Sequence, residues 1–101
     1  MSRTLWDPVD PDALGSLDPR LHARVNGEIY RFSREATLKR FRRDPVRWCG
    51  ILRDPVSGER FVPDITSPRF EYEGVPYFFV SDSTRQAFRD QPARFAIHRR
   101  D

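Results

Sequence analysis

Hydrophobic and polar residues alternate in two stretches of the chain, and each stretch is interrupted by a residue pair ending in glycine. In the first stretch, residues 21–25 and 28–32 flank an Asn-Gly pair, which favours the two-residue turn of a β-hairpin. Pairing Val25 with Glu28 gives this hairpin one mostly apolar face and one face richer in polar side chains. The pattern therefore predicts an antiparallel hairpin over residues 21–32.

The second stretch, residues 70–79, predicts a hairpin of the same kind around a Glu-Gly pair. One face of this hairpin carries most of its large apolar side chains, namely Phe70, Tyr72, Val75, Tyr77 and Phe79. Phe78 falls on the opposite face. There we expect an exposed aromatic ring that packs against the other part of the chain or against a partner.

A helix is expected after each hairpin. Ser33 and Ser81 are expected to cap these helices, because a serine side chain can accept hydrogen bonds from the N–H groups of the first turn. Both helices should end before the X-Pro pairs at residues 44–45 and 91–92, since the residue before a proline disfavours helical geometry.

The chain also repeats itself, because a shift of 47 positions aligns its two parts without a gap. Between residues 5–48 and their counterparts, twelve residues are identical at this shift, and half of them are glycine, proline or aromatic. The identical residues are Leu5, Asp7, Pro8, Val9, Gly27, Tyr30, Phe32, Thr37, Phe41, Arg42, Pro45 and Arg47, each with its counterpart 47 positions later. We expect an α+β fold in which two ββα repeats, residues 5–48 and 52–96, pack as one pseudo-two-fold domain over residues 1–101.

A repeat of this length seldom buries enough surface to be stable alone without a metal ion or a disulfide. We therefore expect the aromatic faces of the two hairpins to form a shared core, and two independently folded units are the alternative. The expected core residues are Tyr30, Phe32, Phe41, Trp48, Tyr77, Phe79, Phe88 and Phe95.

The composition limits the classes of function. The net charge is +3, but 15 acidic residues are interspersed with the arginines, so the positive charge is not concentrated as a nucleic-acid-binding face would require. The apolar runs are too short for a membrane-spanning helix, and the N-terminal residues have no apolar signal core. A single cysteine, Cys49, excludes an intramolecular disulfide. We therefore expect a cytoplasmic protein with no membrane association.

The second part of the chain resembles the YHS domain family. The resemblance rests on Asp-Pro-Val-Ser-Gly at residues 54–58, on Tyr-Glu-Gly-Val-Pro-Tyr-Phe-Phe at residues 72–79, and on Phe88 with residues 92–95. It covers residues 52–96 and extends more weakly, through the repeat, to residues 5–48. It implies a small treble-clef-like unit in which cysteines bind a metal ion.

The family's cysteine positions carry other residues here: Ser57, Val80 and Thr84 in the second repeat, and Asp10, Ser33 and Thr37 in the first. Valine offers no ligand atom, and neutral hydroxyls are poor substitutes for thiolates on zinc or copper. We therefore expect tandem degenerate repeats that bind no metal ion and no other cofactor.

Three other side chains are weak candidates for an improvised metal site: Cys49, His98 and His22. Both histidines have arginine neighbours, which disfavour a bound cation. The aspartates near the N-terminus lack the ligand spacing of a calcium loop, so we expect them to form a solvated, turn-rich strap. These aspartates are Asp7, Asp10, Asp12 and Asp18.

The densest positive cluster lies at residues 39–43, on the first expected helix. The residues expected to bind a partner are Phe78, Arg40, Arg42, Arg43 and Arg47, because arginine and aromatic side chains are enriched at interface hot spots.

These features favour a non-enzymatic accessory module that docks on a larger protein, such as an oxidoreductase or a metal-handling protein. This is because YHS-like domains occur appended to proteins of those kinds. A metal-binding or metal-trafficking protein of YHS type is the alternative. A small basic nucleic-acid-binding module is a second alternative, which the charge pattern does not favour. No catalytic residues are recognised, and self-association, with or without exchange of elements between chains, stays open.

Overall fold

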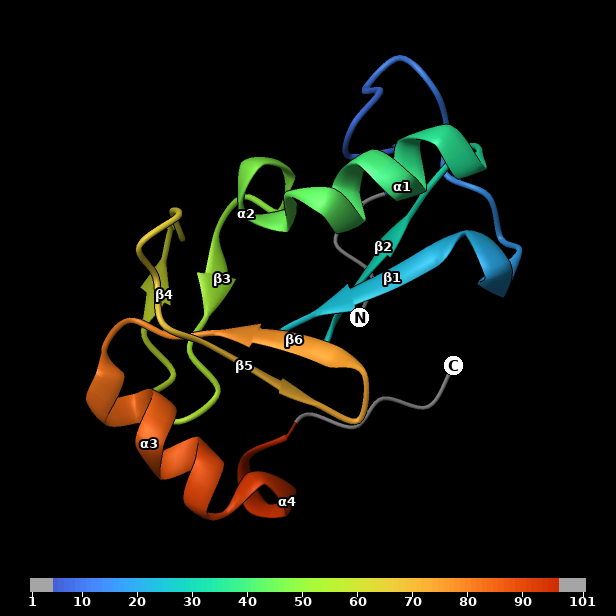
Figure 1. Ribbon diagram of the computed structural model, residues 1–101. Helices are drawn as coiled ribbons and strands as arrows, with labels where there is room; N and C mark the ends of the chain where they lie inside the picture. Colours follow the sequence, from blue (N-terminus) through green and yellow to red (C-terminus); the bar gives the residue numbers. More distant parts are fainter. Residues whose placement is uncertain (1–4, 97–101) are drawn as a thin grey trace.

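A computed structural model describes residues 5–96 of the chain (Figure 1). After an N-terminal loop, the first half contains the short 3-10 helix η1 (Pro19–Leu21), the strands β1 (His22–Val25) and β2 (Glu28–Arg31), and the helices α1 (Glu35–Arg43) and α2 (Pro45–Trp48). The second half contains the strands β3 (Leu52–Arg53), β4 (Arg60–Phe61), β5 (Arg69–Tyr72) and β6 (Val75–Phe78), and the helices α3 (Asp82–Asp90) and α4 (Pro92–Phe95).

The four elements β5, β6, α3 and α4 begin and end 47 residues after β1, β2, α1 and α2. Together the elements form a small α+β domain with short antiparallel sheets of two strands each. The two longer hairpins lie between the helices, with α1 and α2 beyond one hairpin and α3 and α4 beyond the other (Figure 1). Among residues 5–96, no helix combines the length and the apolar character needed to cross a bilayer.

The predicted strand registers are confirmed. In the first hairpin Val25 pairs with Glu28 and Ala23 with Tyr30, and in the second Tyr72 pairs with Val75. Both residues of each turn have positive φ, 51° and 78° in the first turn and 53° and 77° in the second. This is the turn geometry that an Asn-Gly pair favours, because asparagine and glycine tolerate positive φ.

The helices end where the prolines predict, at Arg43 and Asp90, and Pro45 and Pro92 then open the short helices α2 and α4. The expected cap at Ser81 is also confirmed, since its hydroxyl accepts a hydrogen bond from the N–H of Thr84. The expected cap at Ser33 is wrong.

The first turn of α1 begins one residue further on than a Ser33 cap would require, so Arg34 occupies the cap position without a side-chain hydrogen bond. The hydroxyl of Ser33 is instead used elsewhere, because it donates to the carboxylate of Asp7.

Two clusters of buried side chains form the core. One belongs to the first hairpin, α1 and the chain that follows α2, and the other to the second hairpin and α3. Of the expected core residues, Tyr30, Phe32, Phe41, Tyr77, Phe79 and Phe88 are buried. The expectation that the aromatic faces of the two hairpins form one shared core is wrong, because the first three of these residues lie in one cluster and the last three in the other. Trp48 and Phe95 are only half-buried and pack at the edges of the two clusters.

Of the two alternatives for Phe78, packing against the other part of the chain is confirmed, and an exposed ring that binds a partner is wrong. Phe78 is 4% exposed and lies in the cluster of the first half, with residues such as Val25 and Leu52. The face of β6 that carries Phe78 is covered because β1 and β6 lie side by side (Figure 1). Phe78 therefore links the two halves and is not available to a separate partner.

Asn26 makes the most specific link between the halves. Its side-chain oxygen accepts a hydrogen bond from the N–H of Phe78 at 2.7 Å, and its side-chain nitrogen donates to the carbonyl oxygens of Phe78 and Arg53, both at 3.0 Å. Asn26 is 2% exposed, so these bonds are shielded from water. The side chain thus satisfies backbone groups on the edge of β6 that β5 does not reach.

Asn26→Gly is predicted to lower the free energy of unfolding by about 3 kcal/mol, because glycine keeps the positive φ but leaves buried backbone groups without partners. The matched control is Glu73→Gly, at the corresponding position of the second turn, where the side chain is exposed. That control should leave stability unchanged or raise it by up to about 1 kcal/mol by relieving a non-glycine positive φ. Urea unfolding of both variants measures the difference, and equal effects would refute the role given to Asn26.

Candidate functional site

Each half has a buried aspartate where the resemblance would place a metal centre. In the second half this is Asp54, whose exposed fraction is 0%. One carboxylate oxygen accepts hydrogen bonds from the N–H groups of Val56 (2.8 Å) and Ser57 (3.0 Å). The other accepts from the N–H of Val80 (3.0 Å) and from the hydroxyl of Thr84 (2.7 Å). One carboxylate therefore ties its own loop to the end of the second hairpin and to the first turn of α3.

Asp7 occupies the same position in the first half and is 1% exposed. One of its oxygens accepts from the N–H groups of Val9 (2.8 Å) and Asp10 (3.1 Å). The other accepts from the N–H (2.8 Å) and the hydroxyl (2.9 Å) of Ser33 and from the hydroxyl of Thr37. The donors of the two clusters differ by the same 47 positions as the aspartates, so the two halves use one arrangement twice.

The hydrogen bonds decide the ionisation of Asp7. Burial opposes the charged form, but the bonds donated by Ser33, Thr37, Asp10 and Val9 outweigh it and hold the pKa of Asp7 below its ordinary value. Asp7 is therefore a carboxylate at neutral pH. The expectation that it belongs to a solvated strap is wrong, because Asp7 is buried and Ser33 and Thr37, from a distant part of the chain, replace water around it.

The residues at the family's cysteine positions do converge, but on a carboxylate. Ser57, Val80 and Thr84 all donate hydrogen bonds to Asp54, two of them through backbone N–H groups. Val80 has no ligand atom, and the Thr84 hydroxyl is engaged by Asp54. These residues do not fit a zinc or copper ion, whose preferred ligands are thiolates and imidazoles.

The other candidate ligands are not brought together. Cys49 is 1% exposed within the core cluster of the first half, and its thiol donates to the carbonyl oxygen of Gly50 at 3.7 Å. The ring nitrogen Nε2 of His22 lies 2.9 Å from the carbonyl oxygen of Ser16 and donates to it. His98 lies outside the described residues. Among residues 5–96, no group of three histidine, cysteine, aspartate or glutamate side chains is close enough to hold a metal ion.

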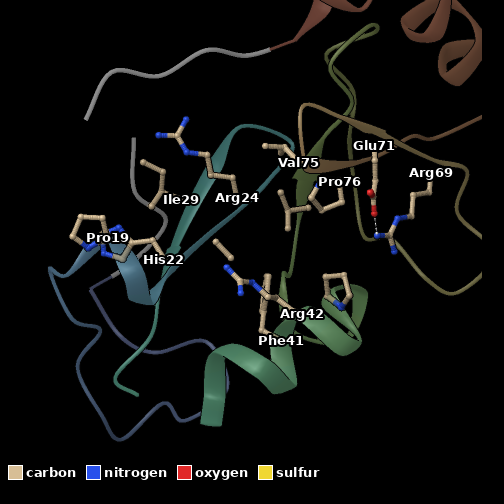
Figure 2. A pocket seen from close by; sticks show the side chains of 14 residues that line it. Pro19, His22, Arg24, Ile29, Phe41, Arg42, Arg69, Glu71, Val75 and Pro76 are labelled. Atoms are coloured by element: carbon tan, nitrogen blue, oxygen red, sulfur yellow. Dashed lines mark hydrogen bonds and ion pairs between the residues drawn. The ribbon is translucent and has the colours of Figure 1, made fainter. Parts of the chain in front are cut away.

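The expected partner-binding arginines are divided between two sides of α1. The guanidinium groups of Arg40 and Arg47 lie over the ring of Trp48, with their central carbons 5.6 and 4.9 Å from the ring centre. The side chains of Arg40, Arg43 and Arg47 are all exposed. Arg42 instead lines a cavity between α1 and the two hairpins (Figure 2).

Two features of this site were not anticipated from the sequence. Trp48 was expected in the core, but it is half-buried and lies beside two arginines. The paired role of Asp7 and Asp54 was missed, although both aspartates and both threonines, Thr37 and Thr84, are among the residues identical at a shift of 47. An aspartate and a threonine retained thirty positions apart in both repeats was the available signal.

A comparison of the chain with protein-family models, with curated proteins and with solved structures finds no match.

Asp7→Asn is predicted to lower the free energy of unfolding at pH 7 by about 2 kcal/mol. The reason is that the NH₂ group of asparagine, a donor, would face the N–H and hydroxyl donors that now bind the carboxylate. The pKa of Asp7 is lowered in the folded protein, so its contribution is fully present above the ordinary aspartate pKa of about 3.9. It is then lost as the pH falls through that value toward the folded-state pKa. The stability difference between wild type and variant should therefore narrow below about pH 4.

Urea unfolding at neutral and acidic pH measures this difference. Asp12→Asn is the control, because Asp12 lies in the same loop with an exposed side chain, and it should change little at either pH. A difference that stays constant with pH, or a loss in the control as large as in Asp7→Asn, would refute the account of Asp7.

Proposed function

We propose that this chain is a non-enzymatic binding module that docks on an acidic segment of a larger protein. The proposed docking face lies on α1 and α2 and consists of Lys39, Arg40, Arg43, Arg47 and Trp48. Its four cationic side chains are exposed, and Trp48 is half-buried among them. Arg42 points to another side of α1 and is left out of this face.

The observation that carries the proposal is a difference in charge between the docking face and the corresponding positions of the second half. Those positions, 47 residues later, hold Gln86, Ala87, Asp90, Arg94 and Phe95. The docking face thus has four cations and no carboxylate, whereas its counterpart has one arginine and one aspartate. Both halves form the same elements, so the extra positive charge is not needed for folding and is free to serve binding.

The helices α1 and α3 also differ in their ion pairs. On α3, Arg85 pairs with Asp82 at 2.8 Å and Arg89 lies 3.7 Å from the carboxylate of Asp90. Within residues 5–96, no cation of the docking face has a carboxylate within ion-pair distance. An acidic partner would supply the missing negative charge, and charge complementarity of this kind speeds association and selects among partners.

Trp48 gives the docking face an apolar centre. Arg40 and Arg47 lie over its ring at cation–π distance, so the three side chains hold one another in place before a partner arrives. Tryptophan and arginine are the residues most enriched at energetic hot spots of protein interfaces. Ordering them in advance reduces the entropy lost on binding.

The size of the docking face favours a peptide segment over a nucleic acid. α1 has nine residues, which corresponds to about 14 Å of helix. Carboxylates lie beside it, since Glu35 is on α1 and Asp44 separates α1 from α2. A phosphate backbone requires positive charge along a longer path. A short acidic stretch of protein needs only the few cations present.

The proposal includes the finer expectations from the sequence. They are that the halves are degenerate YHS-like repeats about a pseudo-two-fold axis, that they act as one domain, and that the partner is larger, an oxidoreductase or a metal-handling protein. The repeated Asp7 and Asp54 clusters support a common origin of the halves, and the buried Asn26–Phe78 link supports one domain. A cytoplasmic location accords with the buried, reduced thiol of Cys49.

Charge reversal on the docking face is predicted to abolish most binding to an acidic chain. The probe is a fluorescently labelled poly-glutamate peptide, and its anisotropy is titrated with the full chain at low salt. Arg40→Glu combined with Arg47→Glu should weaken binding by about tenfold or more, because both attractive contacts become repulsive.

The matched control is Arg89→Glu combined with Arg94→Glu, which changes the net charge by the same amount on α3 and α4. It should weaken binding only about two- to threefold, because only the long-range attraction between the whole protein and the peptide is reduced. Equal losses in both double variants would refute the docking face. If a labelled oligothymidylate binds more tightly than poly-glutamate, and if this binding depends on Arg40 and Arg47, the partner of the docking face is a nucleic acid and not a protein.

A further inference from the structure

A cavity of about 440 Å³ lies between the two hairpins and the C-terminal end of α1 (Figure 2). β1 contributes to one side, β5 and β6 contribute to the other, and Phe41, Arg42 and Pro45 border it from the helical side. Cavities that bind small organic molecules have volumes of about 300–1,000 Å³. This one is large enough for a single aromatic ring with a charged substituent.

One wall of the cavity is apolar. Val25, Ile29 and Phe41 are almost completely covered by the protein itself, but Ala23 and Pro76 are half-buried and leave apolar surface open to the cavity. Val75 adds an apolar side chain from β6. A hydrophobic group that entered the cavity would bury its surface against side chains that the fold already holds in place.

The polar side chains around the cavity are mostly cationic. The first half supplies His22, Arg24 and Arg42, and the second half supplies Arg69 and Glu71. Arg69 binds Glu71 at 2.6 Å, so the one carboxylate among the described lining residues is already neutralised. The remaining charge around the cavity is positive.

Corresponding positions of the two hairpins contribute to this cavity. His22 and Arg69 differ by 47 positions, as do Arg24 and Glu71, and all four line it. Glu71 thus stands where the first hairpin has the cation Arg24, and it pairs with Arg69 and not with Arg42.

Arg42 is the group best placed to bind an anion. It extends from α1 toward the space between β1 and β6 (Figure 2). Within residues 5–96 it has no carboxylate within ion-pair distance. A guanidinium group binds carboxylate or phosphate through two parallel hydrogen bonds, which fixes the ligand's orientation as well as adding affinity.

We infer that this cavity binds a small aromatic anion. The ring of the ligand packs against Ala23, Val75 and Pro76, and its carboxylate or phosphate group binds Arg42. The inference is independent of the proposed docking face, since that face uses other residues of α1 and carries its own test.

The test is a titration of the isotope-labelled full chain, followed by the amide NMR signals, with three probes. Phenyl phosphate combines a ring with an anion, benzyl alcohol offers a ring alone, and inorganic phosphate offers an anion alone. Phenyl phosphate should bind at least about tenfold more tightly than either of the others, because it alone uses both the apolar wall and Arg42. The signals that shift should be those of β1, β6 and the end of α1.

Arg42→Gln should weaken phenyl phosphate binding by about tenfold and leave benzyl alcohol unaffected, since only the anion contact is lost. Arg89→Gln is the matched control, because Arg89 is the exposed counterpart of Arg42 on α3 and lies outside this cavity; it should change neither affinity. Phenyl phosphate binding no tighter than inorganic phosphate, signal shifts confined to other parts of the chain, or equal effects of the two substitutions would overturn the inference.

Discussion

The fold of each half depends on one buried carboxylate. Asp7 and Asp54 accept hydrogen bonds from their own loop and, from 26 to 30 residues further along the chain, from the end of the following hairpin and the first turn of the helix after it. A buried charge is costly unless donors surround it, and here every segment contributes one. In each half the carboxylate therefore holds the loop, the hairpin and the helix together, and no cysteine ligands are needed for this.

The two halves share this framework but differ in what they present outward. On α1 the first half carries cations that have no carboxylate within ion-pair distance among the residues the structure describes, and it has Asn26 in its turn. The second half has internal ion pairs on α3 and an exposed glutamate, Glu73, at the equivalent turn position. Since the shared framework accounts for folding, these differences are the best guide to function. They support the proposed docking face, whereas Arg42, which the second half repeats as Arg89, is singled out by the cavity it lines.

Local signals in the sequence predicted much of the fold, because turn geometry and the effect of proline act over a few residues. The strand registers and both helix ends follow from such signals. The burial of Phe78 could not be predicted in this way, because its side of β6 is covered by a hairpin some fifty residues away. Asp7 was misjudged for the same reason, since its donors Ser33 and Thr37 come from distant segments. The cavity is also formed by distant segments and has no local signature.

The most direct measurement of the central claim is urea unfolding of the full chain, purified without an affinity tag and dialysed against EDTA, compared with the same protein supplied with zinc. If the carboxylates of Asp7 and Asp54 stabilise the two halves and no metal ion is needed, the urea concentrations at the two unfolding midpoints will be the same. A midpoint that falls after chelation and returns when zinc is added back would contradict the account, because it would mean that a metal ion bound to the native state carries the stability.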